Sequence, residues 1–242
     1  MTHYTATAFV DQLKTFQSEE ELEKIQRYFK TGKGDYSEHD QFMGVRMGQV
    51  FELAKAFEPM EPEEIERLLE SPIHEVRAGG VSIMDYQARN RKTPESRKKE
   101  LFDLYLRRHD RINNWDLVDR AAPHVVGGYL WDKPRGILYQ LARSENLWER
   151  RTAIVCTWFF IRKGDVADTF AIGEILIDDP NEIIQKAVGS WLRTAGDKDN
   201  RRLLEFLDQH AAGMPRTALR YAVEHLEDAR RKYYLGLKNP GD

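Results

Sequence analysis

The stretch RINNWDLVD, residues 111–119, holds two side chains whose types and spacing could do chemistry. Trp115 and Asp119 are four residues apart, so on an α-helix they lie on one face and can address the same ligand. A fixed carboxylate opposes positive charge and orients water, and the electron-rich face of an indole attracts cations. For an arbitrary pair with this spacing, a packed tryptophan and an exposed helical aspartate are the favoured interpretation. The surrounding sequence must therefore decide between a packing detail and an active site.

A basic segment, residues 89–111, leads directly into this motif. It carries nine Lys or Arg against four Asp or Glu, whereas the earlier segment PMEPEEIERLLE, residues 59–70, is acidic. Taken alone, a charge run favours a solvated helix face with salt bridges between residues i and i+4. Its position beside Trp115 and Asp119 indicates the alternative, a flank that binds phosphate groups.

Composition indicates a folded, globular chain. Its 242 residues are 41% hydrophobic and 11% aromatic, which is enough apolar material for a sizeable core. The net charge of −3 does not predict nucleic-acid binding by itself, because the distribution of charge decides. Cys156 is the sole cysteine, which excludes a disulfide framework and a cysteine-based metal site. Since the sequence has neither the pattern of a signal peptide nor an apolar stretch of membrane-spanning length, we expect a cytoplasmic protein with no membrane partner.

The spacing of apolar residues predicts helices along nearly the whole chain. Segments such as ELFDLYL, RRTAIVCTWFFI and IIQKAVGSWL place apolar residues at steps of three and four, and no segment sustains a period of two. Four similar segments begin at Ser71, Asp110, Ser144 and Asp179, at spacings of 39, 34 and 35 residues. We expect helices to begin at these polar residues, with a proline in the first turn after Ser71 and Asp179. Such a period predicts an all-α solenoid of the HEAT type, in which equivalent helices line a concave face.

Six segments together resemble the DNA alkylation repair family of HEAT-like alkylpurine DNA glycosylases, the AlkD-like proteins. They are YFKTGKGDYSEHDQFMGVRMGQV, SPIHEVRAG, RINNWDLVDRAAPHVVGGYL, LWERRTAI, IIQKAVGSWLR and MPRTALRYAVEHL, in the family's order over nearly the whole chain. The resemblance implies an all-α superhelix formed by residues 1–242 as a single domain, with a basic concave face that clasps double-stranded DNA. It also implies a monofunctional glycosylase that hydrolyses the N-glycosidic bond of cationic N3- and N7-alkylated purines without base flipping. We expect a monomer without a cofactor, located in the cytoplasm and at the bacterial nucleoid while it acts on DNA.

The functional positions of the family map onto this chain one at a time. Its catalytic aspartate matches Asp119, and the tryptophan one turn earlier matches Trp115. The family's second tryptophan falls on Ser190, with Trp191 one place later, and one step along a helix rotates a side chain by about 100°. The chain therefore departs from the family at one of the two tryptophans that would face the nucleotide. The candidates for DNA binding are Tyr28, Arg150, Arg151, Lys186, Ser190 and Trp191.

The chemistry that the resemblance implies explains these residue types. An N3- or N7-alkylated purine is already cationic, so it is a good leaving group that needs no general acid. Asp119 would stabilise an oxocarbenium-like sugar and orient the attacking water, as carboxylates do in glycosidases. Trp115 would face the cationic nucleotide, and Arg151 would hold a phosphate by charge-assisted hydrogen bonds.

Other functions stay open at the level of sequence. Ser190 favours a DNA-binding relative with weak or no glycosylase activity, and a HEAT-type protein scaffold is the third interpretation. The segment TGKGDY, residues 31–36, lacks the G-x-x-x-x-G-K-[ST] pattern of a phosphate-binding loop, and we expect a loop between helices. No metal site is expected, because no HExxH or other ligand spacing is found among the histidines, which include His74, His109, His124, His210 and His225.

Overall fold

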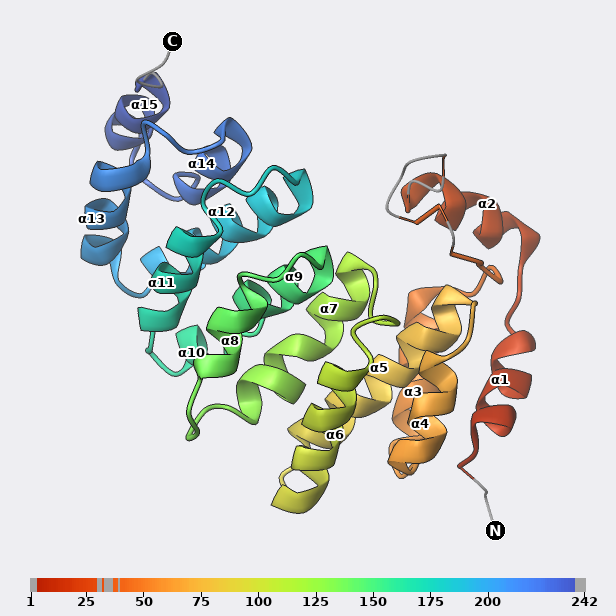
Figure 1. The fold of residues 1–242 in the computed structure, drawn as a ribbon. Coiled ribbons are helices and arrows are strands. Elements are labelled where there is room, and N and C mark those ends of the chain that lie inside the picture. Colours follow the sequence, from red (N-terminus) through yellow and green to blue (C-terminus); the bar gives the residue numbers. More distant parts are fainter. Residues whose placement is uncertain (1–3, 30–31, 33–36, 39, 238–242) are drawn as a thin grey trace. The chain divides into compact units, whose positions relative to one another are not determined.

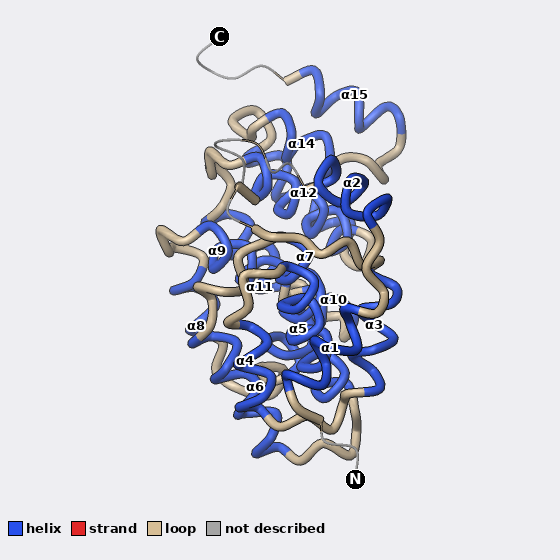
Figure 2. Tube along the Cα trace, turned by 90° about the vertical axis from the view of Figure 1, so that its right-hand side faces the viewer, coloured by secondary structure: helices blue, strands red, loops and turns tan. Residues whose placement is uncertain are grey.

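The chain folds into helices joined by short loops (Figure 1). The computed structural model describes residues 4–29, 32, 37–38 and 40–237. Within these residues there are helices and loops and no strand (Figure 2), although an isolated parallel bridge joins Gln41 and Ile73. The prediction of an all-α helical-repeat fold is thus confirmed. No helix in this part of the chain combines the length and the apolar character needed to cross a membrane.

Two compact units make up the chain, unit 1 from Met1 to Tyr129 and unit 2 from Leu130 to Asp242. Unit 1 is built around α5, whose side chains are almost all buried, with α3, α4 and α7 packed against it. The helices of unit 1 are α1 (Ala6–Lys14), α2 (Glu19–Tyr28), α3 (Met47–Ala56), α4 (Pro62–Leu69), α5 (His74–Arg89), α6 (Glu95–Arg107), α7 (Trp115–Ala121) and the π-helical turn η1 (Ala122–Gly128).

A buried carboxylate on α5 fixes the loop between α2 and α3. Glu75 is fully buried and accepts hydrogen bonds from the backbone N–H groups of Met43 (3.1 Å), Gly44 (2.9 Å) and Val45 (3.3 Å). Gly44 has a φ of +80°, and a Cβ at this position would lie 2.4 Å from the carbonyl oxygen of Ser18. Only glycine fits there without strain. The loop therefore ties α2, which carries Tyr28, to the core of unit 1.

The acidic and basic segments of unit 1 neutralise each other in part. Arg107 and Arg108 on the basic side contact Glu66 on α4, at 2.8 and 3.2 Å. Arg97 pairs with Glu61 in the same way. Exposed pairs of this kind contribute little stability, about 0 to 1 kcal/mol each. Their presence nevertheless favours the interpretation of this charge run as a salt-bridged helix surface.

Unit 2 is organised around α12, which packs against α9, α13 and α14. Gly189 allows the closest of these approaches, because a Cβ there would lie 2.3 Å from the carbonyl oxygen of Ala218 on α14. The helices of unit 2 are α8 (Gly136–Leu141), α9 (Leu147–Val155), α10 (Trp158–Arg162), α11 (Ala167–Ile175), α12 (Glu182–Gly196), α13 (Asn200–His210), α14 (Arg216–Ala222) and α15 (Asp228–Gly236).

The predicted helix starts lie close to real ones but three to five residues too early. α5 begins at His74, and α7, α9 and α12 begin after an asparagine rather than at Asp110, Ser144 or Asp179. Asn114, Asn146 and Asn181 each accept a hydrogen bond from a backbone N–H of the first turn. The earlier Ser144 and Asp179 instead accept from the N–H groups of Asn146 and Asn181, so they shape the turn before the cap.

Candidate functional site

Helix α7 presents Trp115 and Asp119 one turn apart on the same face. The side-chain oxygen of Asn114 caps the helix by accepting a hydrogen bond from the N–H of Trp115 at 2.8 Å. The opposite face of α7 is buried in unit 1, whereas Trp115 and Asp119 are half-buried. Pro123 supplies no N–H for a regular α-helical ladder, and the backbone continues as η1. Such π-helical turns are frequent near functional sites.

Unit 1 brings Tyr28 to Trp115, although 86 residues of sequence lie between them. The two rings meet edge to face with centroids 5.9 Å apart, and Phe29 stacks on the same indole at 5.9 Å. Phe29 is buried, whereas Tyr28 is 65% exposed. Tyr28 is therefore positioned to contact a large ligand that also reaches Trp115.

A buried network of polar side chains holds the first turn of α7 against α5. His74 is fully buried, and its Nε2 lies 2.8 Å from the Oδ2 atom of Asp116. Its other ring nitrogen, Nδ1, lies 3.7 Å from Asp40. Asp40 also contacts the guanidinium of Arg77 and accepts a hydrogen bond of 3.2 Å from Asn114, the capping residue of α7. The network thus connects α5 to the first turn of α7.

The charges of this network favour an imidazolium at His74. Burial lowers the pKa of His74, but the charge of Asp116 and its hydrogen bond, together with the nearby Asp40, outweigh burial and raise the pKa to about 9. Burial raises the pKa of Asp40, yet the proximity of His74 and the charge of Arg77 bring it below its ordinary value. His74 is therefore protonated and Asp40 is ionised at neutral pH.

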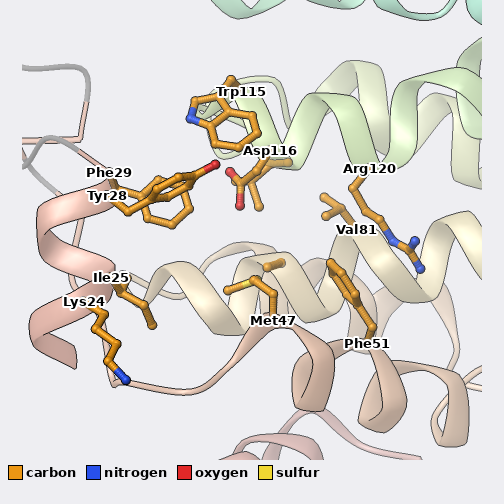
Figure 3. A pocket seen from close by; sticks show the side chains of 12 residues that line it. Lys24, Ile25, Tyr28, Phe29, Met47, Phe51, Val81, Trp115, Asp116 and Arg120 are labelled. Atoms are coloured by element: carbon orange, nitrogen blue, oxygen red, sulfur yellow. The ribbon is translucent and has the colours of Figure 1, made fainter. Parts of the chain in front are cut away.

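A pocket of about 510 Å³ lies between α2, α3, α5 and α7 (Figure 3). Its walls include the rings of Tyr28, Phe29, Phe51 and Trp115, and the carboxylate of Asp116 lies among them. Tyr28 and Trp115 were predicted from the sequence, whereas Asp116 and the pocket were not. The signal in the sequence was weak, since only the position of Asp116 next to Trp115 pointed to it.

Arg120 lines one end of this pocket, and its guanidinium group contacts two aromatic rings and two polar side chains. Its guanidinium carbon lies 4.5 Å from the ring centroid of Phe51 and 4.8 Å from that of Tyr86. Its Nε donates to the hydroxyl of Ser82 at 3.1 Å, and Nη2 lies 3.4 Å from the buried Asp85. Burial raises the pKa of Asp85, against the opposing effect of Arg120 and Arg89.

In unit 2, Arg150 and Arg151 follow each other on α9 but have different surroundings. Arg151 is only 7% exposed, and its Nη1 donates to the carbonyl of Ile183 in the first turn of α12 at 3.0 Å. Arg150 binds Asp179 at 2.6 Å and donates to the carbonyl of Ser144 at 2.9 Å. Both guanidinium groups thus make hydrogen bonds within unit 2 that hold the α9 and α12 starts together.

The predicted positions on α12 separate into two faces. Lys186 is 44% exposed and lies one turn before Ser190, with an ion pair of 3.2 Å to Glu182. Trp191 points elsewhere, since its Nε1 donates to the carbonyl of Val155 at the end of α9 at 3.0 Å. Trp191 therefore joins two helices of unit 2.

The segment TGKGDY lies outside the described residues apart from Gly32, so the expected loop is not described.

Comparison with known proteins relates this geometry to a family. Residues 9–226 match the family described as DNA alkylation repair enzyme. A solved structure described as a predicted DNA alkylation repair enzyme from Enterococcus faecalis matches with a TM-score of 0.70 and 16% sequence identity, over 88% of this chain and 97% of that one. None of the curated proteins matches this chain significantly. The structural likeness concerns the fold, and the sequence match extends over helices of both units.

Proposed function

Since this chain belongs to the DNA alkylation repair enzyme family, we propose that it is a monofunctional glycosylase acting on N3- and N7-alkylated purines in double-stranded DNA, without base flipping. The observation that carries the proposal is the pairing of Trp115 and Asp119 on one face of α7, with Tyr28 beside the indole. The family match extends over most of both units, which supports residues 1–242 acting as one repair domain.

Asp119 and Trp115 carry the catalytic roles in this proposal. The alkylated purine is cationic, so the C1′–N bond breaks without a proton donor and positive charge develops on the sugar. Asp119 stabilises that charge and orients the attacking water, and Trp115 offers the face of its indole to the cationic nucleotide. A carboxylate fixed on a capped helix needs little rearrangement during the reaction, which is the property that such stabilisation requires.

The other candidates serve DNA binding. Among them, Tyr28 and Lys186 have the most exposed side chains, whereas Arg150 and Trp191 are hydrogen-bonded within unit 2. Arg151 is proposed to hold a phosphate by charge-assisted hydrogen bonds from its guanidinium group. The enzyme is proposed to act as a monomer in the cytoplasm or nucleoid. The DNA-binding set comprises Tyr28, Arg150, Arg151, Lys186, Ser190 and Trp191.

A second function, DNA binding with weak or no excision, is favoured by position 190. Ser190 offers no indole, and Trp191 is directed toward Val155. If both indoles are needed for the reaction, the chain binds alkylated duplex and leaves it intact.

One experiment separates the two functions. Duplex DNA containing 7-methylguanine is incubated with excess protein, and release of the base and retention of the duplex are measured in parallel. Release at a rate above that of spontaneous depurination supports the glycosylase. Retention of the duplex with release at the spontaneous rate supports the DNA-binding function.

A further inference from the structure

The pocket of unit 1 has the size and the walls of a small-molecule site. Its volume of about 510 Å³ lies within the range of roughly 300 to 1,000 Å³ that is typical of such sites. The aromatic side chains of Tyr28, Phe29, Phe51 and Trp115 provide flat apolar surfaces on which a planar ring can pack. A flat heterocycle fits this lining better than a flexible chain does.

One polar group within this lining has capacity for a ligand. The Asp116 side chain is 17% exposed and lines the pocket, and Oδ2 interacts with the buried His74. Its other oxygen, Oδ1, is buried and has no hydrogen-bond partner among the residues that the structure describes, so a rotation of the side chain would bring this oxygen to a ligand in the pocket. A carboxylate has about four acceptor positions, and a poorly satisfied one inside an apolar site favours a ligand with N–H donors.

The balance of charge around the pocket favours a neutral ligand. The negative charge of Asp116 is matched by the imidazolium of His74, 2.8 Å away. The positive charge of Arg120 lies 3.4 Å from Asp85, a carboxylate that Arg120 shares with Arg89. A cation in the pocket would meet Arg120 and the Lys24 ammonium at the rim. The lining therefore suits an uncharged ring that carries N–H groups.

We propose that this pocket binds a free, neutral purine base through ring packing and a hydrogen bond to Asp116, and that it receives the excised base during the reaction. The second part rests on the proposed glycosylase function. When the C1′–N bond breaks, its electron pair passes to the purine, whose positive charge is thereby cancelled, and the oxygen of water bonds to C1′ with release of a proton. The product is a neutral alkylpurine with N–H donors, and Trp115 belongs both to the α7 face that carries Asp119 and to the pocket wall.

The test measures binding of free bases to the full chain by calorimetry in the absence of DNA. The wild-type protein is expected to bind 7-methylguanine, and caffeine, a purine of similar size without N–H donors, is expected to bind at least about 10-fold more weakly.

Asp116→Asn presents a donor where the base needs an acceptor, so affinity for 7-methylguanine should fall about 10- to 100-fold. Met47→Trp narrows the pocket without touching the polar network and should also abolish binding. Asp11→Asn, an exposed aspartate of α1, is the matched control and should bind like wild type.

Several outcomes would overturn the proposal. Absence of 7-methylguanine binding to the folded wild type would show that the pocket does not bind purine bases, and this result is independent of whether a base is released from DNA. Equal binding by Asp116→Asn, or equal binding of caffeine, removes the role of the hydrogen bond. If the base binds but no alkylpurine is released from duplex DNA, the proposed function fails and the product role falls with it. Melting curves of each variant show whether a loss of binding reflects unfolding. If Asp116→Asn does not fold, Met47→Trp still tests whether the base binds in this pocket, and unchanged binding by this variant would contradict the proposal.

Discussion

At the scale of single residues, two tryptophans show how neighbours decide what an indole does. Trp115 and Trp191 both lie on helices, and both are predicted site residues. The Trp191 N–H is bound by the carbonyl of Val155, so this ring fastens α12 to α9. Trp115 instead meets Tyr28 and Phe29 at the wall of a pocket. The contacts of each indole therefore differ although both residues lie on helices.

Asp119→Asn tests the residue on which the proposed chemistry depends. The substitution keeps the size of the side chain and removes its charge, so folding and duplex binding should be nearly unchanged. The rate of 7-methylguanine release should fall on the order of 10²-fold or more, because one preorganised electrostatic group is lost. Single-turnover release kinetics measure this, and an unchanged rate in the Asn variant would contradict the catalytic assignment.

Ser190→Trp tests the departure from the family. An indole at this half-buried position should add contact with the cationic nucleotide worth roughly 0.5 to 2 kcal/mol and raise the excision rate accordingly. Trp191→Ala should act chiefly on the free energy of unfolding, because it breaks the contact between α12 and α9. The same release assay and thermal melts distinguish the two effects. An unchanged rate for Ser190→Trp together with a folded but inactive Trp191→Ala would show that the functional indole is Trp191.

At the scale of elements, the geometry of α7 depends on groups that are distant in the sequence. The helix is capped by Asn114, which is itself held by Asp40, and Asp40 belongs to the network of His74 and Arg77 on α5. The contacts of Asp40 with Asn114, His74 and Arg77 join segments that lie dozens of residues apart. The positions of Trp115 and Asp119 are thus fixed by the packing of α7 against α5.

His74 makes the stability of this pair dependent on pH. Its pKa is raised from 6.5 to about 9 in the folded protein, so the folded state holds the proton more tightly than the unfolded chain. The stabilisation is complete below 6.5 and is lost as the pH rises to about 9. The difference corresponds to on the order of 3 kcal/mol.

Denaturant titrations across this pH range provide the measurement. The free energy of unfolding of the wild type should fall more steeply with rising pH than that of His74→Gln. His225→Gln, at an exposed position, serves as the control. Parallel curves for wild type and His74→Gln would show that the proton on His74 does not stabilise the fold.

The sequence predicted the helical class and the placement of Trp115 and Asp119 on one helix, because both depend on local spacing. The steps of three and four residues are visible in any window, and Trp115 and Asp119 lie within a single turn. Helix starts were displaced because several polar residues compete for the cap, and only the folded backbone shows that Asn181 rather than Asp179 accepts the first-turn N–H. The Asp116 pocket was missed since its walls come from four helices, and no local pattern records that His74 lies beneath it.

At the scale of the whole molecule, the proposed affinity for DNA depends more on the distribution of charged side chains than on the net charge. The net charge is −3, and much of the basic segment is already paired with carboxylates of unit 1, as Arg107 is with Glu66. Affinity for duplex DNA must then come from cations that can exchange their partner for a phosphate. Lys186 is such a group, because its pair with Glu182 on the same helix is exposed and weak.

Lys186→Gln should therefore lower duplex affinity and reduce the slope of log K against log salt by about one unit, the contribution of one phosphate contact. Arg107→Gln is the matched control, since it removes the same charge from a position where Glu66 already neutralises it. Its salt slope should equal that of the wild type. Fluorescence anisotropy with an undamaged duplex over a salt series measures both. If Arg107→Gln reduces the slope and Lys186→Gln does not, the phosphate contacts lie on the basic segment, and the salt bridges between α4 and α6 open when DNA binds.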